Sequence, residues 1–239
     1  MALYFDKEST LDFTTTANGS ATHTPVGTPR GVLVLIAQNV TASDLISGVT
    51  YGGVTMTRLT NGFATDAATE IGAVYAYYLG AGIPTGAQTV APTVSSGTDA
   101  KTWWCMTVTA KGDTEVAASG VLNGDQTNPS ITLATVPGFQ GITFAIQWSG
   151  VNTPTSMTAG AGYAKFAHAT SGGRDFGTQT ACAEWKQSTG ANVIANTTTG
   201  ADDCAFCAGA IREKILPTTF NNYQHVSADS GISTTEKIR

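Results

Sequence analysis

The sequence carries little charge. Lysine, arginine, aspartate and glutamate make up 12% of its 239 residues, half of the roughly 25% that soluble domains usually carry. Acidic residues outnumber basic ones by 17 to 12, and no run of basic side chains occurs. Because binding to nucleic acids and to anionic membranes depends on clustered lysine and arginine, the composition disfavours both kinds of partner.

The hydropathy pattern of the sequence predicts neither a signal peptide nor a membrane-spanning segment. The first residues show no basic stretch followed by a long apolar core, so no signal peptide is predicted. The longest aliphatic run, residues 32–37, is far too short to cross a bilayer. We therefore expect a chain that is made in the cytoplasm and does not enter a membrane.

Cysteine is scarce. The four cysteines are too few for a disulfide framework in a chain of this length. Cys204 and Cys207 have the spacing of a metal-binding or redox pair, but residues three apart on a strand point to opposite faces. Their sulfurs would then neither share a zinc ion nor form a disulfide. We expect buried structural thiols, and no metal or other cofactor.

Acid–base chemistry has few candidates. None of the three histidines accompanies a Gly-x-Ser-x-Gly motif of the kind that holds a serine nucleophile. Paired carboxylates suggest glycosidase chemistry, but here they fall in loops and turns, where aspartate is ordinary. The histidines are His23, His168 and His225, and the carboxylate pairs are Asp113 with Glu115 and Asp202 with Asp203. We therefore predict that the chain has no catalytic residue and is not an enzyme.

What the chain does contain is a clear hairpin over residues 49–56. Gly52 and Gly53 form a two-residue turn, for which glycine supplies the positive φ without a Cβ clash. This register places Tyr51 opposite Val54, with Thr50 facing Thr55 and Val49 facing Met56. One face of the hairpin is then apolar and the other is threonine.

Further strand patterns recur at short intervals, separated by glycine and proline. Residues 112–130 read as loop, and Pro92 suggests that its strand lies at a sheet edge. No segment of ten residues or more has a convincing helical stripe. The predicted strands are 31–40, 71–79, 88–94, 101–110, 130–134, 142–148, 161–169, 178–186 and 203–215. The pattern predicts an all-β fold, an antiparallel β-sandwich resembling a jelly roll.

Three regions follow along the chain. Residues 1–30, rich in threonine, are predicted to be an extended N-terminal segment. Residues 31–216 form a single β-sandwich domain. Residues 217–239, which follow Pro217 and have little periodicity, read either as a disordered tail or as an arm that docks on a neighbouring subunit.

Two adjacent tryptophans are the candidate contact residues. On a strand, Trp103 and Trp104 point to opposite faces, so one should leave the core if the other enters it. An outward ring would contact a protein interface, be covered by a loop, or stack on a glycan.

Three segments in order resemble a β-sandwich domain of tailed-bacteriophage structural proteins and related bacterial sequences. They are the Tyr-Gly-Gly hairpin in residues 49–59, Val-Tyr-Ala-Tyr-Tyr-Leu in residues 74–79, and Pro-Thr-Gly-Ala-Gln-Thr-Val in residues 84–90. The match covers about residues 31–110. Because these motifs describe a fold, no functional residue is carried over.

The resemblance implies a non-enzymatic virion structural protein, above all a capsid decoration (cement) protein. The expected partners are the major capsid protein or other virion proteins, and copies of the same chain in a homo-oligomer, with a trimer favoured. The expected location is the virion, after synthesis in the host cytoplasm. Alternatives are a tail-fibre or receptor-binding module that binds carbohydrate and, third, a hydrolase on a jelly-roll scaffold. Fold alone does not separate them.

Overall fold

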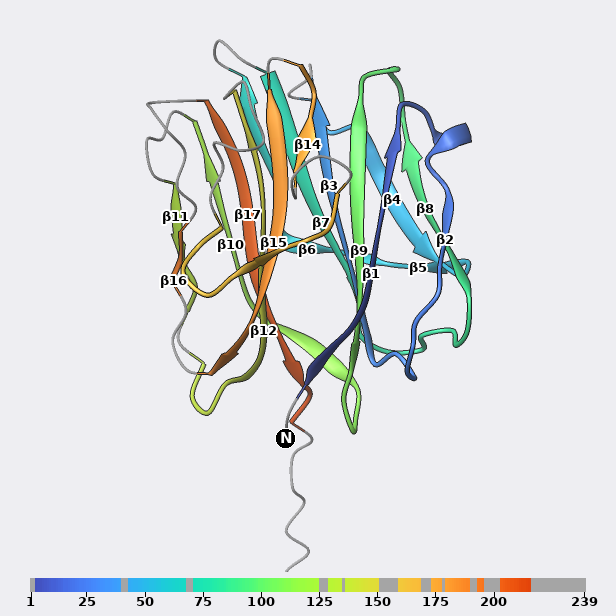
Figure 1. The fold of residues 1–239 in the computed structure, drawn as a ribbon, viewed down its shortest axis with the longest axis vertical. Coiled ribbons are helices and arrows are strands. Elements are labelled where there is room, and N and C mark those ends of the chain that lie inside the picture. Colours follow the sequence, from blue (N-terminus) through green and yellow to red (C-terminus); the bar gives the residue numbers. More distant parts are fainter. Residues whose placement is uncertain are drawn as a thin grey trace, which may run out of the picture.

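The computed structural model describes residues 3–39, 43–67, 71–124, 129–134, 136–150, 159–168, 173–177, 179–189, 193–195 and 203–215. These residues form antiparallel strands, one short 3-10 helix at Thr16–Asn18 and no α-helix, which confirms the all-β prediction (Figure 1). The strands are β1 (Tyr4–Phe13), β2 (Ala21–His23), β3 (Gly31–Asn39), β4 (Ile46–Tyr51), β5 (Val54–Thr55), β6 (Thr57–Ala67), β7 (Ile71–Leu79), β8 (Gln88–Val94), β9 (Lys101–Thr109), β10 (Thr114–Asn123), β11 (Ser130–Thr132), β12 (Gln140–Ser149), β13 (Ala164–Lys165), β14 (Arg174–Asp175), β15 (Thr180–Thr189), β16 (Val193–Ala195) and β17 (Cys204–Glu213).

The sheets are stacked around a central one. This central sheet has the order β1-β9-β3-β7-β6. A second sheet, β2-β8-β4-β5, packs on one face, and we call it the B sheet. A third, β10-β17-β12-β15-β13 with β14 beside β15, packs on the other face, and we call it the C sheet. The short pair β11-β16 forms a separate ladder.

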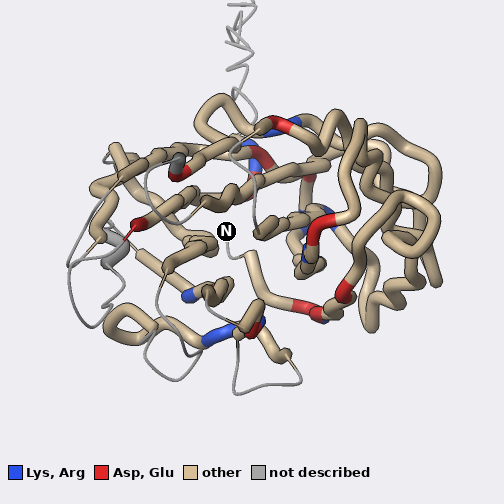
Figure 2. Tube along the Cα trace, turned by 90° about the horizontal axis from the view of Figure 1, so that it is seen from above, with Lys and Arg blue, Asp and Glu red and all other residues tan. Residues whose placement is uncertain are grey.

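Burial on both faces explains why β3 reads as a continuous apolar run. Val32, Val34 and Ile36 pack toward the B sheet, whereas Leu33 and Leu35 pack toward the C sheet. A strand exposed on one side would alternate apolar and polar residues, but a strand covered on both sides has no solvent face. The middle of the central sheet is therefore interior. Figure 2 shows that charged positions of both signs are sparse along the trace.

The hairpin is confirmed in its register. Tyr51 pairs with Val54, Thr50 pairs with Thr55, and the Met56 amide donates to the Val49 carbonyl over 2.9 Å. Gly52 and Gly53 have φ values of 56° and 80°, the left-handed conformation that the two-residue turn requires. The apolar side of the hairpin is buried against the central sheet.

The N-terminal segment is extended, as expected, but it belongs to the sheets. Strand β1 forms one edge of the central sheet by pairing with β9, and β2 pairs with β8 in the B sheet. Residue 30 is therefore no structural boundary. Residues 216–239, and with them the predicted C-terminal tail or arm, lie outside the described residues.

Other sequence predictions need correction. The region predicted as loop contains the ten-residue strand β10, which pairs with β17. The residues of β10 are mostly small and half-buried, so they do not show the apolar–polar alternation from which a strand is predicted. Of the described residues in the strand predicted at 161–169, which are residues 161–168, only Ala164–Lys165 is a strand. Strand β8 lies between β2 and β4, yet β2 pairs only with residues 88–90, so Pro92 itself lies where β8 has a single neighbour. In the described part of the chain, no helix is long and apolar enough to cross a membrane.

Candidate functional site

The structure contradicts the expectation that one tryptophan faces outward. Trp103 and Trp104 both have a relative exposure of 0%. Trp103 packs into the cluster shared with the B sheet, where its indole N–H donates to the Gly19 carbonyl over 2.8 Å. Trp104 packs into the cluster shared with the C sheet. Since the chain itself covers both faces of β9, neither ring is available to a glycan or a partner.

The prediction that the cysteines are buried thiols is confirmed. All four cysteines are buried and none forms a disulfide. Cys204 packs toward the cluster on the outer face of the C sheet, and Cys207 packs toward the central sheet, so the two sulfurs lie on opposite faces of β17. Burial raises the pKa of the Cys207 thiol. Among the described residues, no group of three or more metal-ligating side chains is placed to hold an ion.

A buried polar chain joins the N-terminal strands to β9. Thr107 donates its hydroxyl proton to the Asp6 carboxylate over 2.9 Å, so the Thr107 oxygen accepts from His23 Nε2–H at 3.1 Å. His23 Nδ1 then accepts from the Ser9 hydroxyl at 2.7 Å. His23 has an exposure of 1%. These bonds fix one tautomer of a neutral imidazole and connect β1, β2 and β9.

Burial lowers the pKa of His23 to about 4, although the charge of Asp6 acts in the opposite direction. The imidazole therefore stays neutral at physiological pH. The serine–histidine contact resembles part of a hydrolase triad. However, the histidine is enclosed, and its second nitrogen contacts a threonine rather than a carboxylate. The observed role is to hold β1 and β2 on the central sheet.

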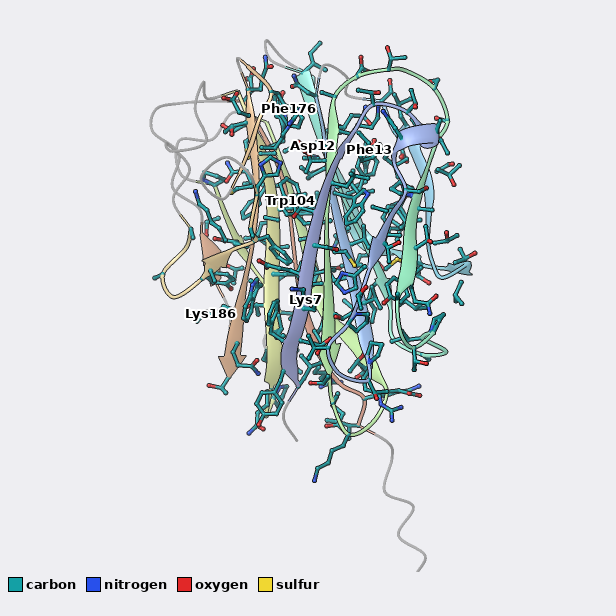
Figure 3. The ribbon with its side chains drawn as sticks, turned by 45° about the vertical axis from the view of Figure 1, so that its right-hand side comes forward. Lys7, Asp12, Phe13, Trp104, Phe176 and Lys186 are labelled. Atoms are coloured by element: carbon teal, nitrogen blue, oxygen red, sulfur yellow. The ribbon has the colours of Figure 1, made fainter. Side chains whose placement is uncertain are left out.

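A second polar cluster lies at the other face of β1. Asp12 accepts hydrogen bonds from His168 Nε2 at 3.0 Å and from the Thr102 hydroxyl at 2.6 Å, and it forms an ion pair with Arg174. The Arg174 guanidinium also lies 5.4 Å from the centre of the Phe176 ring. The cluster joins the edge of the central sheet to β14 of the C sheet. In Figure 3, Asp12 and Phe176 lie toward one end of the sandwich.

The electrostatics of this cluster are those of a surface ion network. Burial alone would raise the pKa of Asp12, but hydrogen bonds from His168 and Thr102, together with the charge of Arg174, hold it below its usual value. The Asp12 side chain is 38% exposed, so solvent weakens its attraction to Arg174. The His168 ring also approaches the Trp104 ring, with 6.1 Å between centres.

A buried carboxyl lies on the outer face of the C sheet. Glu184 has an exposure of 0%, and its Oε2 accepts the Gly160 amide at 2.9 Å. Burial raises the pKa of Glu184 to about 7, although the Gly160 hydrogen bond and the charge of Lys165 oppose the rise. Carboxyls with such pKa values occur at functional sites and also in structural networks. We assign Glu184 no chemical role.

The structure also contains a groove of about 360 Å³, between β6 and β10. It is lined by residues 57–60, Tyr78 and residues 116–119. Leu59 and Tyr78 are 8% and 7% exposed, so the floor is largely apolar. We call this the β6–β10 groove.

Exposed apolar side chains gather where the chain ends leave the sandwich. Figure 1 shows the start of β1 and the end of β17 at the same end of the molecule. Tyr4 pairs with Thr109 at the start of β1, and the Val26 amide donates a hydrogen bond to the nearby Asp6 carboxylate. Ile215 directly follows Lys214, whose amide donates to the Asp113 carbonyl. The exposures of Tyr4, Val26 and Ile215 are 58%, 81% and 68%. We call these three side chains the terminal surface.

The remaining sequence candidates that the structure describes do not assemble into a catalytic site. Glu115 pairs with Arg212 at 2.7 Å rather than with Asp113, and Asp203 is buried. Asp202 and His225 lie outside the described residues. Sequence reasoning missed both polar clusters of β1, because His168 and Asp12 are 156 residues apart in the chain. No local motif marks such a contact.

Comparisons of this chain with protein-family models, with curated proteins and with solved structures found no match.

Proposed function

We propose that this chain is a non-enzymatic virion structural protein, and specifically a capsid decoration protein that binds the major capsid protein through its terminal surface. The observation that carries the proposal is the position of the exposed apolar side chains. Tyr4, Val26 and Ile215 are three of the five large hydrophobic residues with high exposure among those described, and they share one end of the sandwich.

The rest of the molecule suits a passive scaffold. The candidate rings Trp103 and Trp104 are enclosed, and the sparse charge gives little electrostatic repulsion between neighbouring copies. The resemblance of residues 31–110 to phage structural sandwiches supports the same reading. Assembly as a homo-oligomer, with a trimer favoured, is part of the proposal.

The mechanism is burial of apolar surface against a rigid lattice. A fully buried side chain of this size contributes about 1.5–3 kcal/mol, and about 1.4 kcal/mol corresponds to a tenfold change in affinity. A lattice presents many identical sites, so modest binding by each subunit is multiplied when copies also contact one another.

Binding to purified capsids tests the proposal. Capsids from the virus that carries this gene, stripped of the protein, should recover it when the purified chain is added, and labelled protein should be seen on the heads by electron microscopy. Replacing Tyr4, Val26 and Ile215 with serine should weaken binding at least about a hundredfold.

The matched control is the replacement of Ile71 and Val121, the other two exposed hydrophobic residues, with serine. Ile71 starts β7, whose other end precedes Gly80, the residue that accepts a hydrogen bond from the Thr114 amide, so this variant should bind normally. Labelled protein found only on tails, or equal loss of binding in both variants, would refute the proposal.

A further inference from the structure

Both walls of the β6–β10 groove are sheet edges. Within the described residues, β6 pairs with β7 and β10 pairs with β17, so the outer edge of each strand has no ladder partner there. Each strand also carries a bulge beside the groove, between Arg58 and Phe63 in β6 and between Val116 and Ala118 in β10. Free edges of this kind can accept an added extended segment.

The groove has one bridged end and one open end. The Asn61 side chain donates to the Ser119 carbonyl over 2.9 Å and joins the two walls at one end. The other end lies toward Thr114, whose hydroxyl is hydrogen-bonded to that of Tyr78 in the groove floor. A segment entering the groove would therefore come from the Thr114 side.

The C-terminal end of the described chain lies on that side. The last residue of β17, Glu213, pairs with Thr114, and the Lys214 amide donates to the Asp113 carbonyl over 2.7 Å. Ile215 is exposed. An extended chain advances roughly 3.3 Å per residue, so the five residues after Ile215 can span about 17 Å. A reach of that length would carry Phe220 past Thr114 toward Tyr78 in the groove floor.

The composition of the following segment matches the groove. Residues 216–228 contain no lysine, arginine, aspartate or glutamate, and they hold two aromatic residues, Phe220 and Tyr223. The one charged residue lining the groove, Arg58, is paired with Asp44 at 2.6 Å. An uncharged segment with two aromatic anchors therefore has complementary surface to contact and no charge to desolvate.

We propose that residues 218–226 bind the β6–β10 groove of their own chain in an extended conformation, with Phe220 and Tyr223 covering Leu59 and Tyr78. The short connection from β17 gives the segment a high effective concentration at the groove of its own molecule. Docking would leave residues 227–239 for contacts with neighbours. The proposal is independent of the virion role.

Hydrogen exchange on the full-length protein tests the docking. Replacing Phe220 and Tyr223 with serine should speed amide exchange of residues 57–60 and 116–119 at least about tenfold, because the bound segment no longer protects them. The matched control replaces Ile232 and Ile238, in the same C-terminal region, with serine and should leave this exchange unchanged. Equal exchange in the wild type and the Phe220/Tyr223 variant would overturn the proposal.

A change on the groove side provides a second measurement. Thr60→Arg places a long charged side chain at an exposed position of the groove, and it should raise chymotrypsin cleavage after Phe220 and Tyr223. Thr55→Arg, at an exposed position in β5, is the control. Unchanged cleavage in Thr60→Arg would count against docking. Groove protection that disappears on dilution of about 50-fold would assign the segment to a second molecule and refute same-chain binding.

Discussion

Strand β1 is held on its two faces by opposite kinds of chemistry. Toward the B sheet, Ser9 and the Asp6 carboxylate contribute to a hydrogen-bond chain centred on the buried, neutral imidazole of His23. Toward the C sheet, the partly exposed Asp12 carboxylate forms an ion pair with Arg174 and accepts a hydrogen bond from His168. Hydrogen bonds around a buried neutral imidazole respond to protonation more than to salt, whereas a partly exposed ion pair responds to salt. The same strand is therefore attached by two contacts that fail under different conditions.

The two outer sheets show a related difference in pH response. The B-sheet side encloses His23, whose pKa is lowered, and the C sheet encloses Glu184, whose pKa is raised. Both groups are neutral when buried. Acid therefore destabilises the attachment of the B sheet, and alkali destabilises the C sheet.

The largest expected effects come from the two tryptophans, because each fills one of the two interlayer cores. Trp103→Ala and Trp104→Ala should each lower the free energy of unfolding by about 3–5 kcal/mol. Hydrogen exchange should rise in β4 and β8 for the first variant and in β12 and β15 for the second. If an alanine variant does not fold, Trp→Phe gives the same contrast at smaller amplitude. If each variant raised hydrogen exchange equally in the B sheet and the C sheet, the two interlayer cores would not respond independently, and the prediction would be wrong.

Acid should weaken the B-sheet side through His23. Its folded pKa of about 4 lies below the unfolded value of 6.5, so the unfolded state binds the proton first as pH falls. The stability present above pH 6.5 should decline by about 3 kcal/mol by pH 4. His23→Gln should remove this loss while lowering stability at pH 7. Denaturant unfolding at several pH values from 4 to 7 measures this loss of stability. If the unfolding free energy of the variant fell with pH as steeply as that of the wild type, the assignment to His23 would be wrong.

Glu184 should act in the opposite direction. Its folded pKa of about 7 lies above the usual value of 4.5, so its stabilising contribution is complete below pH 4.5 and is lost as pH rises through 7. Glu184→Gln, which keeps an acceptor for the Gly160 amide, should raise stability at pH 8 by about 2–3 kcal/mol and change little at pH 4. Thermal unfolding at both values tests this, and a stabilisation that is equal at the two pH values would contradict it.

The smallest effect belongs to the Asp12 cluster. Arg174→Met keeps a long apolar side chain but removes the charge, and it should cost less than about 1 kcal/mol at low salt because Asp12 is partly solvated. The difference from the wild type should vanish near 1 M salt, where the screening length is about 3 Å. A cost that persists at high salt would mean that Arg174 acts through packing on Phe176.

Features that depend on local interactions could be predicted from the sequence, whereas features that depend on contacts between distant segments could not. The hairpin at residues 49–56 was predicted with its register, since Gly52, Gly53 and the alternation around them are local signals. Strand β10 was not, because its half-buried small residues do not alternate and its strand form depends on pairing with β17. The sequence predicts that Trp103 and Trp104 point to opposite faces of their strand, but it does not predict that another sheet covers each of these faces.

By itself, the sequence determined the all-β class, the strands with strong apolar patterns, and the opposite orientation of Cys204 and Cys207. These follow from local backbone preferences and from the two-residue repeat of a strand. Only the tertiary structure decided that the central sheet is covered on both faces, that Trp103 and Trp104 are both enclosed, and that residues of the first 30 complete two sheets. It also brought together His168 and Asp12, and placed β6 beside β10. Such contacts join positions far apart in the chain, and no local pattern encodes which surfaces will meet.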